Sequence, residues 1–137
     1  IRYVTNDISA LKNRSCSCGR SLPLMEDVTT KAEDILALRD GRMISPSVLT
    51  HPFKPMHCVE QSQIIQEDYD RITIKIVPNG EFRPADSEHL IREFKARLGE
   101  DMHIQVETVQ ELPRTRSGKF KWVISRVDKG IKVPSGE

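Results

Sequence analysis

The residues from 71 to 77 constrain the fold of this chain more than any other stretch. Polar residues alternate there with β-branched apolar ones, and the apolar positions are Ile72, Ile74 and Ile76. Because the side chains of a strand point alternately to its two faces, this spacing predicts a strand with one buried face. Residues 59–67 predict a second strand, and residues 68–70 form the turn that joins the two.

A helix is predicted after these two strands. Asp86 and the two residues that follow it begin the helix by capping it and by placing acid in its first turn. Apolar side chains then fall on one face at helical spacing, namely Leu90, Ile91, Phe94 and Leu98. Gly99 suits the position just after the last turn. Alternation over residues 102–108 predicts another strand with one buried side.

The segment ahead of the strands predicts a hairpin and a short helix. Asp40-Gly41 lies between apolar runs, and Gly accepts the positive φ that a hairpin turn needs. Ser45 as N-cap and Pro46 as first residue predict a helix to about residue 51. Residues 120–125 fit either a helix or a strand. The order of elements predicts a small α+β domain of ferredoxin-like type, with an antiparallel sheet and helices on one face.

The composition argues against several classes of function. The chain has 137 residues and a formal net charge of +1, so there is no overall electrostatic case for nucleic acid or a membrane. No apolar run approaches the roughly 20 residues needed to span a bilayer, and the start lacks a secretory signal pattern. The three cysteines, Cys16, Cys18 and Cys58, do not form a disulfide framework. We therefore expect a cytoplasmic protein with reduced thiols.

The loop over residues 112–120 is the segment that most indicates chemistry. Pro113 and Gly118 argue against a regular helix or strand there. Four cations lie close together in and just after the loop, namely Arg114, Arg116, Lys119 and Lys121, and the next acidic residue is Asp128. A Lys directly after a Gly on such a loop can meet a phosphate or a carboxylate as a compact point charge. The alternative interpretation is a solvated basic loop without a ligand.

Four short motifs resemble, in their order along the chain, those of adenylate-forming enzymes such as acyl-CoA ligases. They are Arg2-Tyr3-x-Thr5-x-Asp7, Cys16-Ser17-Cys18-Gly19-Arg20, Asp40-Gly41-Arg42-Met43-Ile44-Ser45-Pro46 and Gly118-Lys119-Phe120-Lys121-Trp122-Val123. The closest resemblance is to the phenylacetate-CoA ligase branch and its capsular-polysaccharide-biosynthesis (CapK-like) relatives. It implies a C-terminal fragment of a longer enzyme, which agrees with the missing initiator Met. Residues 1–32 then correspond to the end of the large N-terminal domain and the hinge, and residues 33–137 to the C-terminal lid domain.

The resemblance implies roles for four residues. Lys119 would be the catalytic cation, which reaches the acid and the α-phosphate of ATP together and lowers their repulsion. Asp7 would accept hydrogen bonds from the ATP ribose, although Asn6 stands where the family has Gly. Lys31 would replace the family's Arg beside ATP, and Glu33 would replace the Asp on which the lid pivots. The Gly of the family's hinge motif is absent.

The resemblance also implies ATP, Mg2+ and coenzyme A as substrates and cofactors. The parent enzyme would convert an acid, expected to be aryl, to an acyl-adenylate and then to a CoA thioester. The fragment alone would be inactive, because the acid pocket and most ATP contacts belong to the large domain. Cys16 and Cys18 would be half of a metal site that other residues of the parent complete, and we expect no metal in this fragment alone.

Two other functions stay open. One is an adenylyltransferase of the CapK or coenzyme F390 synthetase type, which makes no CoA thioester. The other is a non-catalytic ferredoxin-like binding module. Against a module for RNA, neither alternating strand exposes aromatic side chains for base stacking. Phe120 and Trp122 are instead predicted to anchor the packing, and the isolated N-terminal strand predicts that the fragment dimerises by edge pairing.

Overall fold

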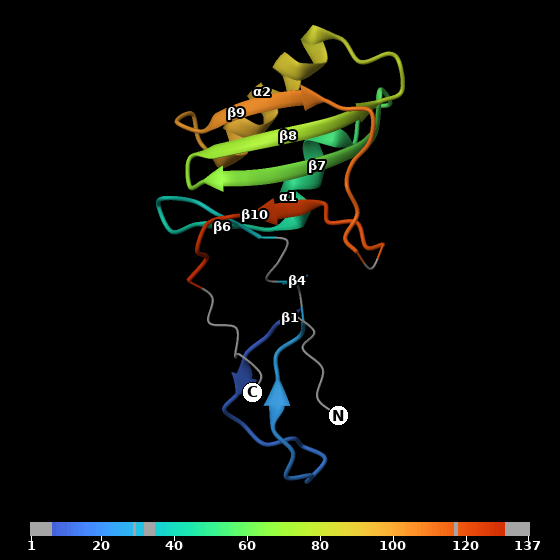
Figure 1. The fold of residues 1–137 in the computed structure, drawn as a ribbon. Coiled ribbons are helices and arrows are strands. Elements are labelled where there is room, and N and C mark those ends of the chain that lie inside the picture. The colour runs from blue at the N-terminus through green and yellow to red at the C-terminus, as the bar shows by residue number, and fades with distance from the viewer. Residues whose placement is uncertain (1–6, 29, 32–34, 117, 131–137) are drawn as a thin grey trace.

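A four-stranded sheet forms the centre of the molecule (Figure 1). The computed structural model describes residues 7–28, 30–31, 35–116 and 118–130. The strands lie in the order β10 (Val123–Ser125), β7 (Val59–Asp68), β8 (Arg71–Pro78) and β9 (His103–Thr108). β7 and β8 are antiparallel neighbours, so the predicted pair of strands is confirmed.

The sheet is mixed, and the prediction of a purely antiparallel sheet was wrong. β9 runs parallel to β8, and β10 runs parallel to β7. Parallel neighbours need a crossover connection, which α2 (Pro84–Leu98) supplies between β8 and β9. The α+β class is confirmed, and the open choice for residues 120–125 is resolved as a strand, β10.

The helices lie on one face of the sheet, as predicted (Figure 1). They are α1 (Pro46–Thr50), the 3₁₀ turn η2 (His51–Phe53) and α2. Phe94 of α2 lies edge-on to Phe53, with 5.6 Å between the ring centroids. The alternating apolar residues of β8 are fully buried in the core that these helices cover, and they are Ile72, Ile74 and Ile76.

The helix starts differ in detail from the predicted ones. α2 begins at Pro84, before the predicted Asp86, because Asp86 acts from the third helical position. Its Oδ2 accepts a hydrogen bond from the Arg83 N–H at 2.7 Å. Ser45 is the N-cap of α1 but makes no side-chain capping bond, and its Oγ instead lies 2.9 Å from that of Ser47.

The predicted hairpin is formed by β5 (Leu36–Ala37) and β6 (Met43–Ile44). Gly41 has a φ of 85° in its turn, so the Gly is required there. Arg42 joins this turn to the end of α2, because its guanidinium donates a hydrogen bond to the Leu98 carbonyl at 3.0 Å. The hairpin is therefore part of the packed domain rather than an extension from it.

Two further pairs of short strands precede the sheet. β1 (Asp7–Ile8) pairs with β4 (Thr30–Lys31), and β2 (Leu11–Lys12) pairs with β3 (Leu24–Met25), both antiparallel. Figure 1 shows these strands below the sheet and apart from it. Large apolar side chains are exposed around them: Leu11, Leu22, Met25 and Val28. Within the described residues, neither helix has the length and apolar character that crossing a membrane requires.

Candidate functional site

The basic loop folds into a tight hairpin between β9 and β10. Arg114 and Phe120 pair as an isolated antiparallel bridge at its base. Within it, the Thr115 N–H donates to the Lys119 carbonyl and the Gly118 N–H donates to the Thr115 carbonyl, each at 2.8 Å. Gly118 has a φ of 78°, in the left-handed region that favours Gly. The Gly of the motif thus forms the turn that presents the next residue, Lys119.

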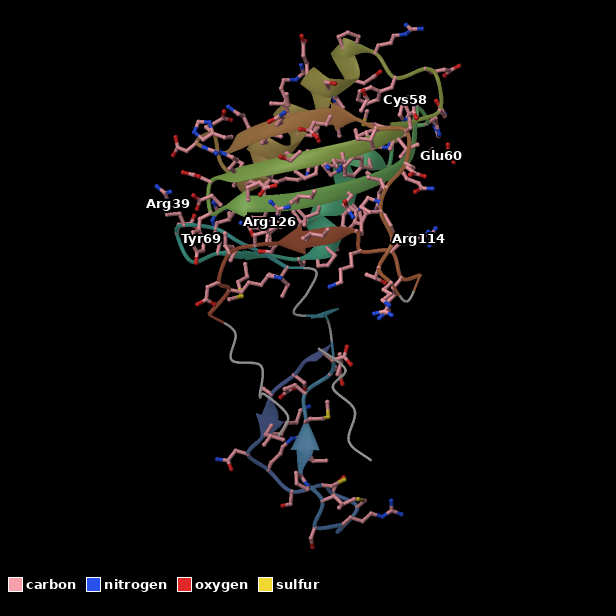
Figure 2. The ribbon with its side chains drawn as sticks, in the orientation of Figure 1. Arg39, Cys58, Glu60, Tyr69, Arg114 and Arg126 are labelled. Atoms are coloured by element: carbon pink, nitrogen blue, oxygen red, sulfur yellow. The ribbon has the colours of Figure 1, made fainter. Side chains whose placement is uncertain are left out.

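The turn holds the backbone of Lys119 and leaves its side chain exposed. Thr115 Oγ1 accepts a hydrogen bond from the Lys119 N–H at 3.0 Å. The Arg114 guanidinium donates to the Gly118 carbonyl at 3.3 Å. The side chains of Arg116 and Lys119 are exposed to solvent. Figure 2 shows Arg114 at the right-hand end of the sheet, so this end carries the basic hairpin.

Two consecutive residues of β7 fix the returning strand of this hairpin to the sheet. The Gln63 Nε2 donates to the Lys121 carbonyl at 2.7 Å, and the Trp122 Nε1 donates to Ser62 Oγ at 3.1 Å. Trp122 also lies edge-on to Phe53, with 6.3 Å between ring centroids. The prediction that Trp122 anchors the packing is therefore confirmed.

The structure brings together two of the residues predicted to contact ATP. Asp7 and Lys31 are direct partners across the β1–β4 pair. Figure 1 shows this pair below the sheet, whereas the basic hairpin extends from the right-hand end of the sheet. Glu33, the predicted hinge residue, lies outside the described residues, as does Ser117 of the basic loop.

The two neighbouring cysteines occupy a turn between β2 and β3. The Cys18 N–H lies 3.5 Å from Cys16 Sγ, and the Gly19 N–H donates to the Cys16 carbonyl at 3.1 Å. The hydrogen bond with the Cys16 side chain lowers the pKa of the exposed Cys18 thiol, with help from the Arg20 backbone. Among the described residues, His, Cys, Asp and Glu side chains do not form any group of three or more that could bind a metal ion.

Two open clefts lie elsewhere on the domain. One, of about 480 Å³, is lined by Arg39, Arg42, Tyr69 and Asp101 among others, and Figure 2 shows Arg39 and Tyr69 at the end of the sheet opposite Arg114. The other, of about 360 Å³, includes Cys58, Asp86 and His89. Burial raises the pKa of the Cys58 thiol, and the nearby Asp86 carboxylate raises it further. This thiol is thus stabilised in its protonated, unreactive form.

The residues that sequence analysis missed are two buried glutamines of β7. Gln63 is 1% exposed and Gln66 is 0% exposed. Gln63 fixes the basic hairpin, whereas Gln66 binds the backbone of Ala37 in β5 through both ends of its amide. The signal was present in the sequence, because Gln63-Ile64-Ile65-Gln66 places a long amide on each side of an apolar pair within a predicted strand.

The chain belongs to the family of CapK C-terminal domains. The family model matches residues 36–126, which is more than half of the chain, and the match covers the β5–β6 hairpin, the sheet and the basic hairpin. No curated protein matches the sequence closely enough to count as a relative.

Two solved structures are similar in fold over part of their length. One is acetoacetyl-CoA synthetase from Streptomyces lividans, with 18% identity, a TM-score of 0.46, and coverage of 69% of this chain and 15% of that chain. The other is an open conformation of 2-hydroxyisobutyryl-CoA ligase with 2-HIB-AMP and CoA, with 21% identity, a TM-score of 0.46, and coverage of 87% of this chain and 27% of that one. The chain thus spans less than a third of either protein.

Proposed function

We propose that this chain is the C-terminal lid domain of an adenylate-forming acid ligase, with Lys119 as its catalytic cation. The observation that carries the proposal is the basic hairpin itself. Its turn holds the backbone of Lys119 by two hydrogen bonds to Thr115, while the Lys119 side chain extends into solvent. A cation on such a support can enter the active site of a larger domain and leave it again.

The chemistry that Lys119 would serve is the joining of two anions. A carboxylate must approach the α-phosphate of ATP, and the charge that moves to pyrophosphate must be stabilised. An ammonium placed between the reactants lowers their repulsion and stabilises the transition state more than the ground state. The hairpin is suited to this role because hydrogen bonds within its own turn hold the backbone of Lys119.

The N-terminal strands would supply the ribose contact and the connection to the large domain. Asp7 would accept hydrogen bonds from the ribose hydroxyls, Lys31 would lie beside the same nucleotide, and Glu33 would be the hinge. The pairing of Asp7 with Lys31 supports a shared site. Exposed apolar side chains such as Leu11 (79%) and Leu22 (70%) support a surface that a further part of the enzyme covers.

The two enzymatic alternatives, a CoA ligase and a CapK-type adenylyltransferase, differ in whether the acyl group is transferred to coenzyme A. We propose thioester formation on coenzyme A with an aryl acid as substrate, and the CapK-type adenylyltransferase without a thioester is the alternative. Full-length enzyme given acid and MgATP should consume ATP faster when CoA is added and should form an acyl-CoA. An activity that ignores CoA would favour the adenylyltransferase.

Acid-dependent ATP–pyrophosphate exchange by the full-length enzyme tests the proposal. A panel of aryl and short-chain acids would be compared for wild type, Lys119→Ala and Arg116→Ala. Exchange should fall about 100-fold in Lys119→Ala, which corresponds to about 2.7 kcal/mol of transition-state stabilisation. Arg116, an exposed cation of the same hairpin, is the matched control and should stay within a few-fold of wild type. Equal rates for wild type and Lys119→Ala would refute the role of this lysine.

A further inference from the structure

Gln63 has an unusual position for an amide side chain. It lies within β7, and only 1% of it is exposed. Its Nε2 donates to the Lys121 carbonyl at 2.7 Å, but its Oε1 is buried and has no hydrogen-bond partner among the described residues. A buried acceptor without a partner costs about 1–3 kcal/mol. An apolar side chain of the same size would avoid this cost, so Gln63 does not serve the stability of the sheet.

Gln66, on the same strand, has hydrogen bonds at both ends of its amide. Its Oε1 accepts hydrogen bonds from the Ala37 N–H at 3.3 Å and from Ser125 Oγ at 2.8 Å. Its Nε2 donates to the Ala37 carbonyl at 2.5 Å. By comparison, the only contribution of Gln63 within the described residues that an apolar residue would lack is its bond to Lys121.

The bond from Gln63 acts at the base of the hairpin that presents Lys119. Lys121 lies two residues after Lys119 on the same returning strand. Ser62 and Gln63 are consecutive in β7 and point to opposite faces of the sheet, so they hold Lys121 and Trp122 from both sides. Between this clamp and Lys119, the Arg114–Phe120 bridge joins the two strands of the hairpin. A change at Gln63 would therefore alter the direction in which the whole hairpin leaves the sheet.

We propose that Gln63 is a positioning residue for Lys119, and this inference rests on the proposed function. Gln63 does not touch the substrates and acts through the Lys121 carbonyl. Its removal should leave ATP binding unchanged and should lower the rate of the step that Lys119 serves. A displacement of the catalytic group by about 1 Å can cost up to about 100-fold in rate, so a loss of about 10-fold is expected.

The first part of the test measures the hairpin without any assay of activity. Full-length Gln63→Leu and Gln66→Leu would be digested with limiting trypsin under native conditions, and cleavage after Arg114, Arg116, Lys119 and Lys121 would be followed by mass spectrometry. Gln66→Leu is the matched control, because it removes an equally buried amide of the same strand that bonds Ala37 of β5 and Ser125 of β10 instead of Lys121. We expect cleavage in the hairpin to become at least about 5-fold faster in Gln63→Leu alone. If Gln63→Leu does not fold, Gln63→Met keeps an unbranched chain of similar length.

The second part measures how the effect depends on Lys119. Pyrophosphate exchange would be measured for Gln63→Leu, Lys119→Ala and the double variant, with kcat and the KM for ATP determined separately. We expect kcat to fall about 10-fold in Gln63→Leu with an unchanged KM, and to be the same in the double variant as in Lys119→Ala. A residue that merely supports the fold would instead lower the rate by the same factor in both backgrounds.

The outcomes separate this inference from the proposed function. Equal hairpin cleavage in Gln63→Leu and Gln66→Leu overturns the inference, whatever the exchange assay gives. Faster cleavage with an unchanged kcat, or with equal losses in both backgrounds, overturns the positioning role. If Lys119→Ala exchanges pyrophosphate as fast as wild type, the proposed function is refuted, and the positioning role is refuted with it. The trypsin result then decides only whether Gln63 holds the hairpin.

Discussion

Two hairpins of this domain are each joined to β7 by a buried glutamine. The hairpin over residues 36–44 lies within the packed domain, where Leu36 and Ala37 are buried and Gln66 uses both ends of its amide. The basic hairpin over residues 114–120 is exposed at its tip, and Gln63 holds it by one hydrogen bond at its base. The first hairpin is thus fixed to the core through its first strand, whereas the second is fixed at its base alone.

This difference suits the hairpin over residues 36–44 to a structural role and the basic hairpin to contact with a ligand. A backbone segment whose N–H and carbonyl are both bonded to a buried amide can change its position only by breaking these bonds. A hairpin ordered by its own turn and clamped at its base keeps a defined direction while its side chains stay accessible. The domain therefore combines a hairpin held in the core with exposed cations such as Arg114 at the opposite end of the sheet from Arg39 (Figure 2).

The largest expected difference between the two hairpins is in stability. Gln66→Leu leaves the buried N–H and carbonyl of Ala37 without partners, which should lower the free energy of unfolding by about 3 kcal/mol. Gln63→Leu also removes a buried acceptor that has no partner among the described residues, so its free energy of unfolding should change by less than about 1 kcal/mol. Urea unfolding of both variants measures this contrast. Equal destabilisation would mean that both amides serve the fold.

The sequence predicted the elements whose patterns are local. Alternation in β8 and the apolar face of α2 depend on neighbours a few residues apart, and both were found where expected. The direction of the outer strands was not predicted correctly, because it depends on crossovers that the pattern of one strand does not contain. The local sequence marked the two glutamines as unusual, but their roles were missed because the residues that they bind are distant in the chain. Gln66 and Gln63 bind residues that are 29 and 58 positions away in the chain.

In the candidate site, too, local features were predicted from the sequence and the pairing of distant segments was not. The Gly-Lys motif correctly marked a turn, because the positive φ of Gly118 is a local requirement. The opposition of Asp7 and Lys31 is a register between distant segments, which their motifs alone did not give. The catalytic and ribose-binding roles come from resemblance, and they stay predictions until the exchange assay is made.

Substitutions of the two turn glycines form a second matched pair, and their effects should be smaller than those of the glutamine variants. Gly41 and Gly118 have φ values of 85° and 78°, and a Cβ added at either position would meet no other group within 4 Å. Ala at either site should therefore cost about 1 kcal/mol of backbone strain rather than a steric clash. We expect Gly41→Ala to lower the melting temperature by about 5 °C, because its hairpin is part of the packed domain.

The backbone strain in Gly118→Ala should affect the rate of pyrophosphate exchange more than the melting temperature. Because the tip of the basic hairpin packs against little, the strain should displace the tip and lower kcat for pyrophosphate exchange about 5-fold, with a smaller change in melting temperature. Calorimetry and exchange kinetics on both variants make the comparison. The contrast between the hairpins would be contradicted if Gly41→Ala lowered kcat as much as Gly118→Ala does.

The smallest expected effect is a response of one hairpin to acid. Hydrogen bonds from the Arg42 backbone and then from its guanidinium lower the pKa of Asp40 in the first hairpin. A pKa that is lower in the folded state means that the carboxylate stabilises the hairpin above its unfolded pKa, and that this stabilisation is lost as the pH falls through the folded pKa. The basic hairpin has no acidic residue between Glu111 and Asp128, so it lacks such a group.

Hydrogen exchange at single amides can measure this difference. After correction for intrinsic rates, protection of the Arg42 N–H, which donates to Asp40 Oδ1 at 3.0 Å, should fall below about pH 4. Protection of the Lys119 N–H, which donates to the Thr115 hydroxyl, should not change over the same range. Asp40→Asn keeps an oxygen acceptor without a titrating charge, so it should remove the pH dependence at Arg42. A parallel loss of protection at both amides would indicate that acid loosens the whole domain and not the turn that Asp40 holds.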